Sequence, residues 1–476
     1  MVVQHNMQAA NANRMLNVTT GQQAKSTEKL SSGYRINRAA DDAAGLSISE
    51  KMRKQIRGLD KASSNAEDGV SSVQTAEGAL TEVHSMLQRM NELATQSANG
   101  TNSTTDRSAI QDEISQLTTE IDRVAETTKF NETYLLKGGD GTKQEYMKGH
   151  DAGLKGALTD GTTKATFKVA AGALDEGKSV TIGGKDYTIG SAVADVQTAV
   201  GKLNTAGDKV TVNDKTYTYV AANTAAPGGQ NVTTAGWVLD GDKTSVAGTT
   251  LTIANGDKVT TTPKNGASAS YTAAEMDNGV SKADPSIISA EKAVSLMKDE
   301  LIAANKVGVT NGTVEITGNP AYDKDNGVTF NINKGSAEVA NKLSFSLHVG
   351  SDADMTNKIT VGIETMNSSY LGIKGLNVND DSGIAGTYAI DAISDALQKV
   401  SDQRSSLGAV QNRLEHTIDN LDNVVENTTS AESRIRDTDM AKEMVNYSKN
   451  NILAQAGQSM LAQANQSNQG VLSLLQ

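Results

Sequence analysis

Both ends of this chain carry long seven-residue repeats of apolar and small side chains, and no proline interrupts them. Residues 1–130 and 390–476 contain no proline, whereas all 4 prolines of the chain lie between these segments. Proline interrupts helices because it lacks a backbone N–H and clashes with the preceding turn. The distribution therefore predicts helices at both ends, which can pair with one another, and a different kind of structure in the middle.

The N-terminal repeat predicts one long helix over residues 45–98. Two rows of side chains, each with a spacing of seven residues, form the seam of a helix that packs along its length. One row holds Leu59, Ala66, Val73, Leu80, Leu87 and Ala94, and the other holds Ala62, Gly69, Ala76, Val83, Met90 and Ser97. The small residues in this seam predict close approach of another helix.

Other segments at the two ends have further helical patterns. After a polar break at residues 97–103, a second helix is predicted around residues 110–124, and another long helix over residues 393–425. Residues 5–32 and 438–474 have narrower apolar stripes. Isolated helices of that kind are marginal in water, so we expect both termini to be disordered in the monomer and to fold on assembly.

The middle of the chain predicts β-structure. It is rich in Gly, Thr and Asn, and short runs alternate between apolar and polar residues. Strand–turn–strand patterns occupy residues 179–189 and 209–219, with a helical stretch at 192–203 between them. The remaining predictions are a hairpin at 251–261, strands at 313–316, 328–332, 343–349 and 359–363, and a linker at 138–143.

Together these patterns predict an α+β multidomain fold. A discontinuous terminal α-helical coiled-coil bundle, in which N- and C-terminal segments pair, carries an inserted β-rich outer region. The predicted domains are residues 1–44 with 433–476, residues 45–140 with 341–432, and residues 141–340 as one or two domains.

Composition narrows the class of protein. The net charge of −12, without a basic cluster, argues against nucleic-acid binding. The sequence has no run of about 18 apolar residues, so we expect no transmembrane helix and no membrane partner. The chain has 0 cysteines, which excludes disulfides and thiolate metal sites. Its first residues lack the apolar core and cleavage site of a secretory signal peptide.

The sequence patterns of a catalytic site are also missing. The 5 histidines are scattered, and neither an HExxH motif nor a phosphate-binding glycine loop occurs. Asp352 and Asp354 resemble the start of a calcium loop, but the glycine and the closing glutamate of such a loop are absent. We therefore expect no enzyme activity, no metal and no cofactor, and we predict a polar hairpin tip around these two residues.

Several segments, in the same order along the chain, resemble bacterial flagellins. They are residues 6–16, 30–46 (LSSGYRINRAADDAAGL), 87–93 with 96–99, 128–131, 349–350 with 371–373, 431–441 (AESRIRDTDMA) and 474–476. The resemblance covers roughly residues 1–140 and 340–476, and the middle of the chain lies where flagellins vary.

The resemblance implies a structural subunit that polymerises into the extracellular bacterial flagellar filament. It also implies export without a cleaved signal peptide, and partners that comprise further copies of the chain, a flagellar export chaperone and the filament cap. The terminal helices would line the filament's inner tube, and the inserted region would face outward. The residues expected to carry assembly are Leu16, Leu30, Ile452, Met460, Val471 and Leu474.

A second implication of the resemblance is recognition by Toll-like receptor 5. The positions that match the family's receptor contacts are Arg89, Leu93 and Glu113, with Gln96 and Ile110 nearby. Arg89 would donate charge-assisted hydrogen bonds, and Leu93 would fill an apolar site on the receptor. The same residues would face a neighbouring subunit in the filament, which explains them equally well.

Two other functions share this architecture. A hook–filament junction protein has similar terminal helices, and an adhesive surface fibre would bind a glycan or mucin through residues 150–340. An enzyme carried on a filament is disfavoured by the missing motifs.

Overall fold

The computed structural model describes residues 6–226, 231–241, 249–380 and 382–473, and it divides into two compact units. The first unit comprises Met1–Gln74, Phe345–Val361 and Leu407–Gln476, and the second comprises Thr75–Ser344 and Gly362–Ser406. Two long helices, α2 (Ala43–Ser97) and α7 (Ile384–Arg436), contribute residues to both units. The three domains predicted from the sequence stay a prediction.

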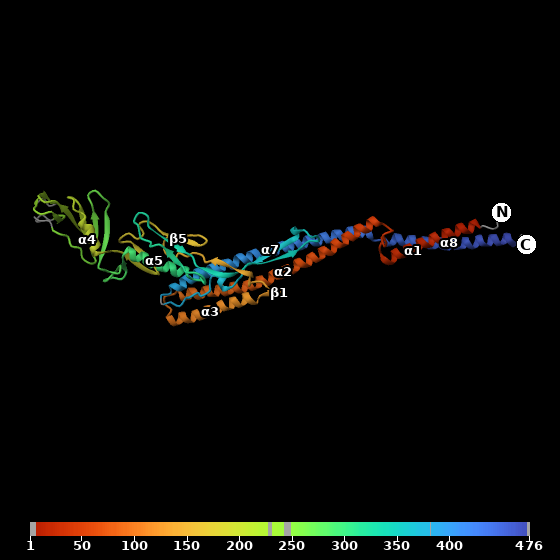
Figure 1. The fold of residues 1–476 in the computed structure, drawn as a ribbon, viewed down its shortest axis with the longest axis horizontal. Coiled ribbons are helices and arrows are strands. Elements are labelled where there is room, and N and C mark those ends of the chain that lie inside the picture. Colours follow the sequence, from red (N-terminus) through yellow and green to blue (C-terminus); the bar gives the residue numbers. More distant parts are fainter. Residues whose placement is uncertain (1–5, 227–230, 242–248, 381, 474–476) are drawn as a thin grey trace. The chain divides into compact units, whose positions relative to one another are not determined.

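In the first unit, α1 (Met7–Ser32) and α8 (Met440–Ser473) lie side by side and run antiparallel (Figure 1). The side chain of Asn6 caps α1 by accepting from the amide of Ala9, and its Nδ2 donates to the carbonyl of Ala464 at 3.2 Å. Gly33, at φ 79°, ends α1 in the left-handed conformation that glycine adopts most easily. The two predicted terminal helices are confirmed, and their disorder in the free monomer stays a prediction.

The connections α1–α2 and α7–α8 are joined to each other by backbone hydrogen bonds. The amide of Arg35 donates to the carbonyl of Arg436 at 2.6 Å, and the amide of Thr438 donates to the carbonyl of Gly33 at 2.9 Å. The Arg436 guanidinium lies 4.5 Å from the ring centroid of Tyr34 and 3.1 Å from the carboxylate of Glu50. The terminal helix pair is therefore joined to the long helices by two connections that are hydrogen-bonded to each other. We call them the paired connection.

A β-hairpin packs on α2 within the first unit. Its strands are β22 (Leu343–His348) and β23 (Lys358–Ile363), with a 3₁₀ turn at Met355–Asn357, so the predicted strands and polar tip are confirmed. Asn65 of α2 donates to the carbonyl of His348 at 3.0 Å. A Cβ at Gly69 would lie 2.2 Å from Cδ1 of Leu347. The glycine predicted in the seam therefore leaves room for a side chain of the hairpin, where the sequence predicted another helix.

The second unit contains a layer of helices made by α2, α3 (Thr104–Thr127) and α7. A capping box between Ser103 and Asp106 starts α3 by satisfying amides that have no partner inside the helix. The seam residues Leu80 and Leu87 are fully buried, as the repeat predicts. After α3, the short strands β1 (Lys129–Phe130) and β2 (Thr133–Tyr134) form a hairpin.

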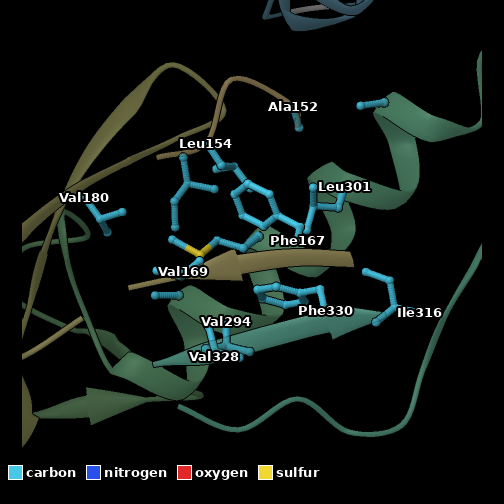
Figure 2. Packing of buried hydrophobic residues seen from close by; sticks show 14 of the residues in the cluster. Ala152, Leu154, Phe167, Val169, Val180, Val294, Leu301, Ile316, Val328 and Phe330 are labelled. Carbon is cyan, nitrogen blue, oxygen red and sulfur yellow. The ribbon is translucent and has the colours of Figure 1, made fainter. Parts of the chain in front are cut away.

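The β-rich part of the second unit has one core around Phe167 and Phe330 (Figure 2). Their rings are fully buried, with centroids 6.3 Å apart. A four-stranded sheet in the order β19-β20-β5-β4 and a five-stranded sheet in the order β16-β17-β18-β7-β6 contribute to this part. Helix α5 (Ala290–Asn305) covers the core with Val294 and Leu301. The strands are β4 (Ala157–Asp160), β5 (Lys164–Val169), β6 (Ser179–Ile182), β7 (Lys185–Ile189), β16 (Met276–Asp277), β17 (Val280–Ser281), β18 (Ile287–Ile288), β19 (Glu315–Thr317) and β20 (Val328–Asn333).

A second core lies between α4 (Val193–Gly201) and a six-stranded sheet in the order β13-β10-β9-β14-β15-β8. Its aromatic contact joins Tyr219 and Trp237, whose ring centroids are 5.4 Å apart in an edge arrangement. The strands are β8 (Ser191–Ala192), β9 (Lys209–Val212), β10 (Lys215–Val220), β13 (Gly236–Leu239), β14 (Lys258–Thr262) and β15 (Ala269–Ala274). Short strands β11 (Thr224–Ala225) and β12 (Asn231–Val232) pair nearby in sequence.

Most predicted strands are confirmed, two predictions for the middle need correction, and one helix was missed. The hairpins at 179–189 and 209–219 are β6–β7 and β9–β10. Residues 138–143 are not a linker, because most of them belong to β3 (Gly139–Tyr146), which pairs with β21 (Ser336–Asn341). Residues 251–254 do not form a strand, so the predicted hairpin at 251–261 keeps only its turn at 255–256 and its second strand, β14. Helix α5 was not predicted. In the described part of the chain, no helix is both long and apolar enough to cross a membrane.

Candidate functional site

Two helical surfaces carry the residues predicted to function. One is the outer face of the α1–α8 pair in the first unit, and the other lies where α2 turns into α3 in the second. Neither resembles a metal site, and the described residues hold no group of three or more His, Cys, Asp or Glu side chains that could bind a metal ion.

The α1–α8 pair exposes large apolar side chains along both helices. On α8, Ile452 is 67% exposed and Met460 is 60% exposed. The other exposed large apolar residues of the pair are Met7, Met15, Val18, Met440, Met444, Val445 and Leu453. Large apolar side chains exposed together along one helix pair are typical of a surface that another molecule covers. We call these residues the terminal apolar face.

The terminal apolar face is hollowed between its two helices. A hollow of about 740 Å³ is lined by both helices, including Met15 and Leu16 of α1 and Gly457 and Met460 of α8. Leu16 is half-buried because it lies opposite Gly457, where a Cβ would be 3.4 Å from its Cδ1. Two predicted assembly residues, Ile452 and Met460, therefore point outward, while Leu16 packs within the pair.

The other predicted assembly residues lie nearer the ends of these helices. Leu30 is half-buried in the last turn of α1. Val471 lies in the last turn of α8, where the structure describes the backbone alone. Leu474 lies outside the described residues.

At the α2–α3 surface, Arg89 joins the two helices through ion pairs. Its Nε donates to Oε1 of Glu113 at 2.9 Å, and its Nη1 donates to Oε2 of Glu92 at 3.2 Å. All three side chains are well exposed, at 51% for Arg89, 44% for Glu113 and 70% for Glu92. Hydrogen bonds to Glu113 and then Glu92 raise the pKa of Arg89. The structure thus brings together Arg89 and Glu113, two of the predicted receptor-binding residues.

Gln96 lies on the same surface, at the end of α2. Its side chain is exposed, and its carbonyl accepts a hydrogen bond from the side chain of Asn102 in the turn before α3. Gln96 is therefore accessible to a partner, at a point where the backbone is held in place.

Leu93 and Ile110 differ from the expectation that they contact a receptor. Leu93 is 2% exposed and Ile110 is 7% exposed, so both side chains belong to the core of the helical layer. Leu93 precedes the seam residue Ala94 and belongs to neither seam row. The seven-residue spacing therefore does not predict whether its side chain is buried or exposed. In this structure both residues support the surface from beneath and present almost no apolar area to a partner.

Sequence reasoning missed Arg107, which fixes the turn between α2 and α3. Arg107 is 3% exposed, and it donates to the carbonyls of Ser97 at 3.0 Å, Asn99 at 3.3 Å and Asp380 at 3.0 Å. A buried arginine with several hydrogen bonds orders the loops that it contacts. No sequence signal points to this role, since its partners here are backbone carbonyls.

Comparisons with known proteins match both ends of the chain. Residues 3–140 match the family described as the bacterial flagellin N-terminal helical region, and residues 390–475 match the bacterial flagellin C-terminal helical region. The two matched ranges contain the α2–α3 surface and the whole terminal apolar face.

Relatives extend the match through the middle of the chain. A flagellin of Clostridium tyrobutyricum is 41% identical over 472 residues, which are 98% of this chain and 100% of the relative. A flagellin of Bacillus subtilis is 33% identical over 477 residues, which are 100% of both chains. Among solved structures, FliC from Burkholderia pseudomallei is 20% identical, with a TM-score of 0.28, over 72% of this chain and 99% of that chain.

Proposed function

Because the chain belongs to the bacterial flagellin family and is a structural subunit of the extracellular flagellar filament, we propose specific roles for its two helical surfaces. The terminal apolar face carries the contacts between subunits. The exposed ion-pair surface around Arg89 carries recognition by Toll-like receptor 5. The observation that supports the first role is the set of exposed apolar side chains on α1 and α8.

The terminal apolar face gains its stability from neighbouring copies. Each 100 Å² of apolar surface removed from water contributes about 2.5 kcal/mol before the entropy of ordering is subtracted. A contact between different faces of two copies gives an open helical filament when its repetition does not close into a ring. Folding of the termini on assembly would then add an ordering cost of about 2–5 kcal/mol to each addition.

The domain roles follow from the same proposal. Residues 1–44 and 433–476 form the inner tube, residues 45–140 and 341–432 form the surrounding helical layer, and residues 141–340 face outward. An export chaperone covers the apolar stripe of α8 beforehand, and the filament cap guides insertion.

Receptor recognition rests on the exposed charged groups. Arg89 and Glu113 present a fixed donor and acceptor pair, and Gln96 adds an amide at the neighbouring helix end. Leu93 and Ile110 act as positioning residues, because they hold α2 and α3 at the spacing that lets Arg89 reach Glu113. The receptor side chains would replace part of the Arg89–Glu113 pairing with intermolecular hydrogen bonds.

Filament growth tests the role of the terminal apolar face. Purified chain is mixed with filament seeds and examined by negative-stain microscopy, beside the variants Ile452→Asp and Met460→Asp. A charge on this face should stop growth, whereas Leu239→Asp, at an exposed apolar residue of β13, should leave it intact. Growth of the two face variants at the wild-type rate would refute the proposal. Failure of the unmodified chain to grow would favour a junction protein or an adhesive fibre.

Binding to the receptor ectodomain tests the second role. The monomeric chain is compared with Arg89→Ala and Glu113→Ala by surface plasmon resonance. Loss of a central charged contact typically weakens binding by tenfold or more, about 1.4 kcal/mol. The matched control is Arg53→Ala, since Arg53 makes a similar exposed pair with Glu50 on α2. Equal affinities for Arg89→Ala, Arg53→Ala and the unmodified chain would exclude this surface.

A further inference from the structure

A hollow that neither proposed role uses lies within the second unit. It has a volume of about 530 Å³ and is formed by the end of α5, the segment 374–380 and the first turns of α7. Its apolar lining comes from Ala303, Val307, Val309, Ile384 and Ala385. Binding pockets for small organic molecules commonly measure about 300–1,000 Å³ and are mostly apolar, with a few polar groups.

Two glycines allow close contacts at the wall of this hollow, one with a backbone carbonyl and one with a side chain. Gly308, between two lining valines, has φ +75°, and a Cβ there would lie 2.2 Å from the carbonyl oxygen of Gly372. Gly183, at the tip of the β6–β7 hairpin, has φ +55°, and its Cβ would lie 2.7 Å from Oε1 of Glu300. Only glycine allows both approaches without strain. The backbone contact of Gly308 therefore fixes the wall that carries the two valines, and the side chains of Glu300, Lys306 and Lys374 complete the lining.

Tyr388 closes one side of the hollow with its aromatic ring. The residue is 7% exposed, and its hydroxyl donates to the carboxylate of Glu300. Burial and this carboxylate raise the pKa of Tyr388. Because its hydroxyl is hydrogen-bonded to Glu300, Tyr388 presents only its apolar ring to the hollow. The Glu300 carboxylate in turn already accepts a hydrogen bond.

The second carboxylate of the lining is also occupied. Asp380 accepts from the amides of Gly383 at 2.9 Å and Ile384 at 3.0 Å, and from the hydroxyl of Ser382. Lys306 and Lys374 differ, since both are exposed and neither ammonium group has an ion pair or hydrogen bond to any residue that the structure describes. The free hydrogen-bond donors of the lining are therefore the two ammonium groups, which lie beside its apolar residues.

We propose that this hollow is a binding site for a small amphipathic organic anion, such as a medium-chain fatty carboxylate. Its carboxylate pairs with Lys306 and Lys374, and its alkyl chain lies over Ala303 and Ile384. A ligand of about ten heavy atoms would bind with a Kd on the order of 1 mM. The site acts independently of assembly and of receptor recognition.

The test uses the full-length monomer with ¹³C-labelled isoleucine methyl groups, and octanoate as the probe. The methyl signal of Ile384, assigned with Ile384→Val, should shift with saturation near ~1 mM. The double variant Lys306→Gln, Lys374→Gln should bind octanoate about three- to tenfold more weakly than the unmodified chain does. The uncharged probe 1-octanol should bind the unmodified chain no more tightly than octanoate binds the double variant. Ala303→Phe should fill the hollow and abolish the shift of the Ile384 signal with octanoate and with octanol. The control Lys298→Gln, on the same helix, should leave the affinity for octanoate unchanged.

The alternative outcomes separate this site from other apolar surfaces. A shift confined to Ile452, on the terminal apolar face, would overturn the proposal, because the probe would then bind there alone. Equal binding of octanol and octanoate at Ile384 would overturn the anion assignment. An unchanged Ile384 signal at about ten times the expected Kd would overturn the site altogether.

Discussion

Two glycines of the same helix predict opposite effects of one substitution. Gly69 and Gly78 both lie inside α2, where alanine is favoured over glycine by about 1 kcal/mol. A Cβ at Gly78 meets nothing within 4 Å, whereas a Cβ at Gly69 would lie 2.2 Å from Cδ1 of Leu347 and 3.3 Å from Cδ1 of Leu414. Gly78→Ala should therefore stabilise its segment by the full propensity gain.

Gly69→Ala should receive the same stabilisation from helix propensity, but crowding against Leu347 should offset it. Overpacking of this kind usually costs about 1–3 kcal/mol, so the net effect lies between roughly zero and 2 kcal/mol of destabilisation. The difference between the two alanine variants is then about 1–3 kcal/mol. The clash involves the hairpin β22–β23, so loosening should appear in the hairpin as well as in the helix.

Hydrogen exchange measured by mass spectrometry suits this comparison. A chain of several units does not unfold in one step, whereas exchange reports the opening of each segment separately. Exchange around residue 78 should slow about fivefold in Gly78→Ala, since 1 kcal/mol corresponds to that factor. Exchange of residues 345–361 should accelerate in Gly69→Ala and stay unchanged in Gly78→Ala.

A double variant makes the reasoning refutable. Leu347→Ala leaves room for a Cβ at position 69, so its combination with Gly69→Ala should be more stable than the two single effects predict. Equal protection of the hairpin in Gly69→Ala and in the unmodified chain would show that the hairpin does not rest on Gly69. Strict additivity of the two substitutions would lead to the same conclusion.

Three further changes test other local features. Glu132 has φ 67° in the β1–β2 turn, where glycine is favoured, so Glu132→Gly should stabilise that hairpin by about 0.5–1 kcal/mol, seen as slower amide exchange, and no gain would show a relaxed turn. Ser103→Ala removes the cap of α3 and should cost about 1 kcal/mol; exchange of the first α3 amides measures this, and Ser115→Ala in the same helix is the control. Burial raises the pKa of Asp391, so its charged form opposes folding, and Asp391→Asn should raise the Tm at neutral pH. That advantage should vanish as the pH falls below about 4, where the unfolded-state carboxyl is also protonated, and a constant difference across this range would contradict the assignment.

The helices could be predicted because their signal is local. Seven-residue spacing placed the long helix at 45–98, and the structure has it at Ala43–Ser97. The same spacing identified Gly69 as a point of close approach. Spacing did not show what fills that approach, since the hairpin strand with Leu347 lies almost three hundred residues further along the chain.

Features that depend on distant segments escaped prediction. Strand β3 looks like a polar linker until β21 pairs with it about two hundred residues later. The burial of Leu93 depends on packing of the helical layer, which one helix's repeat cannot specify. Helix α5 did have a local signal, with Ser289 as its N-cap and Ala293, Met297 and Leu301 at helical spacing, and the glycine-rich surroundings concealed it.

The paired connection at Tyr34 and Arg436 has a mechanical consequence. A single peptide connection transmits tension but turns freely, because its backbone dihedrals rotate. Here two connections run side by side and are linked by two backbone hydrogen bonds, with the Arg436 guanidinium stacked on Tyr34. Such a ribbon resists torsion, since twisting it must break those bonds, while it still bends across its thin direction. Torque applied to the terminal helix pair is thus transmitted to the long helices, because the paired connection can bend but resists rotation about its long axis.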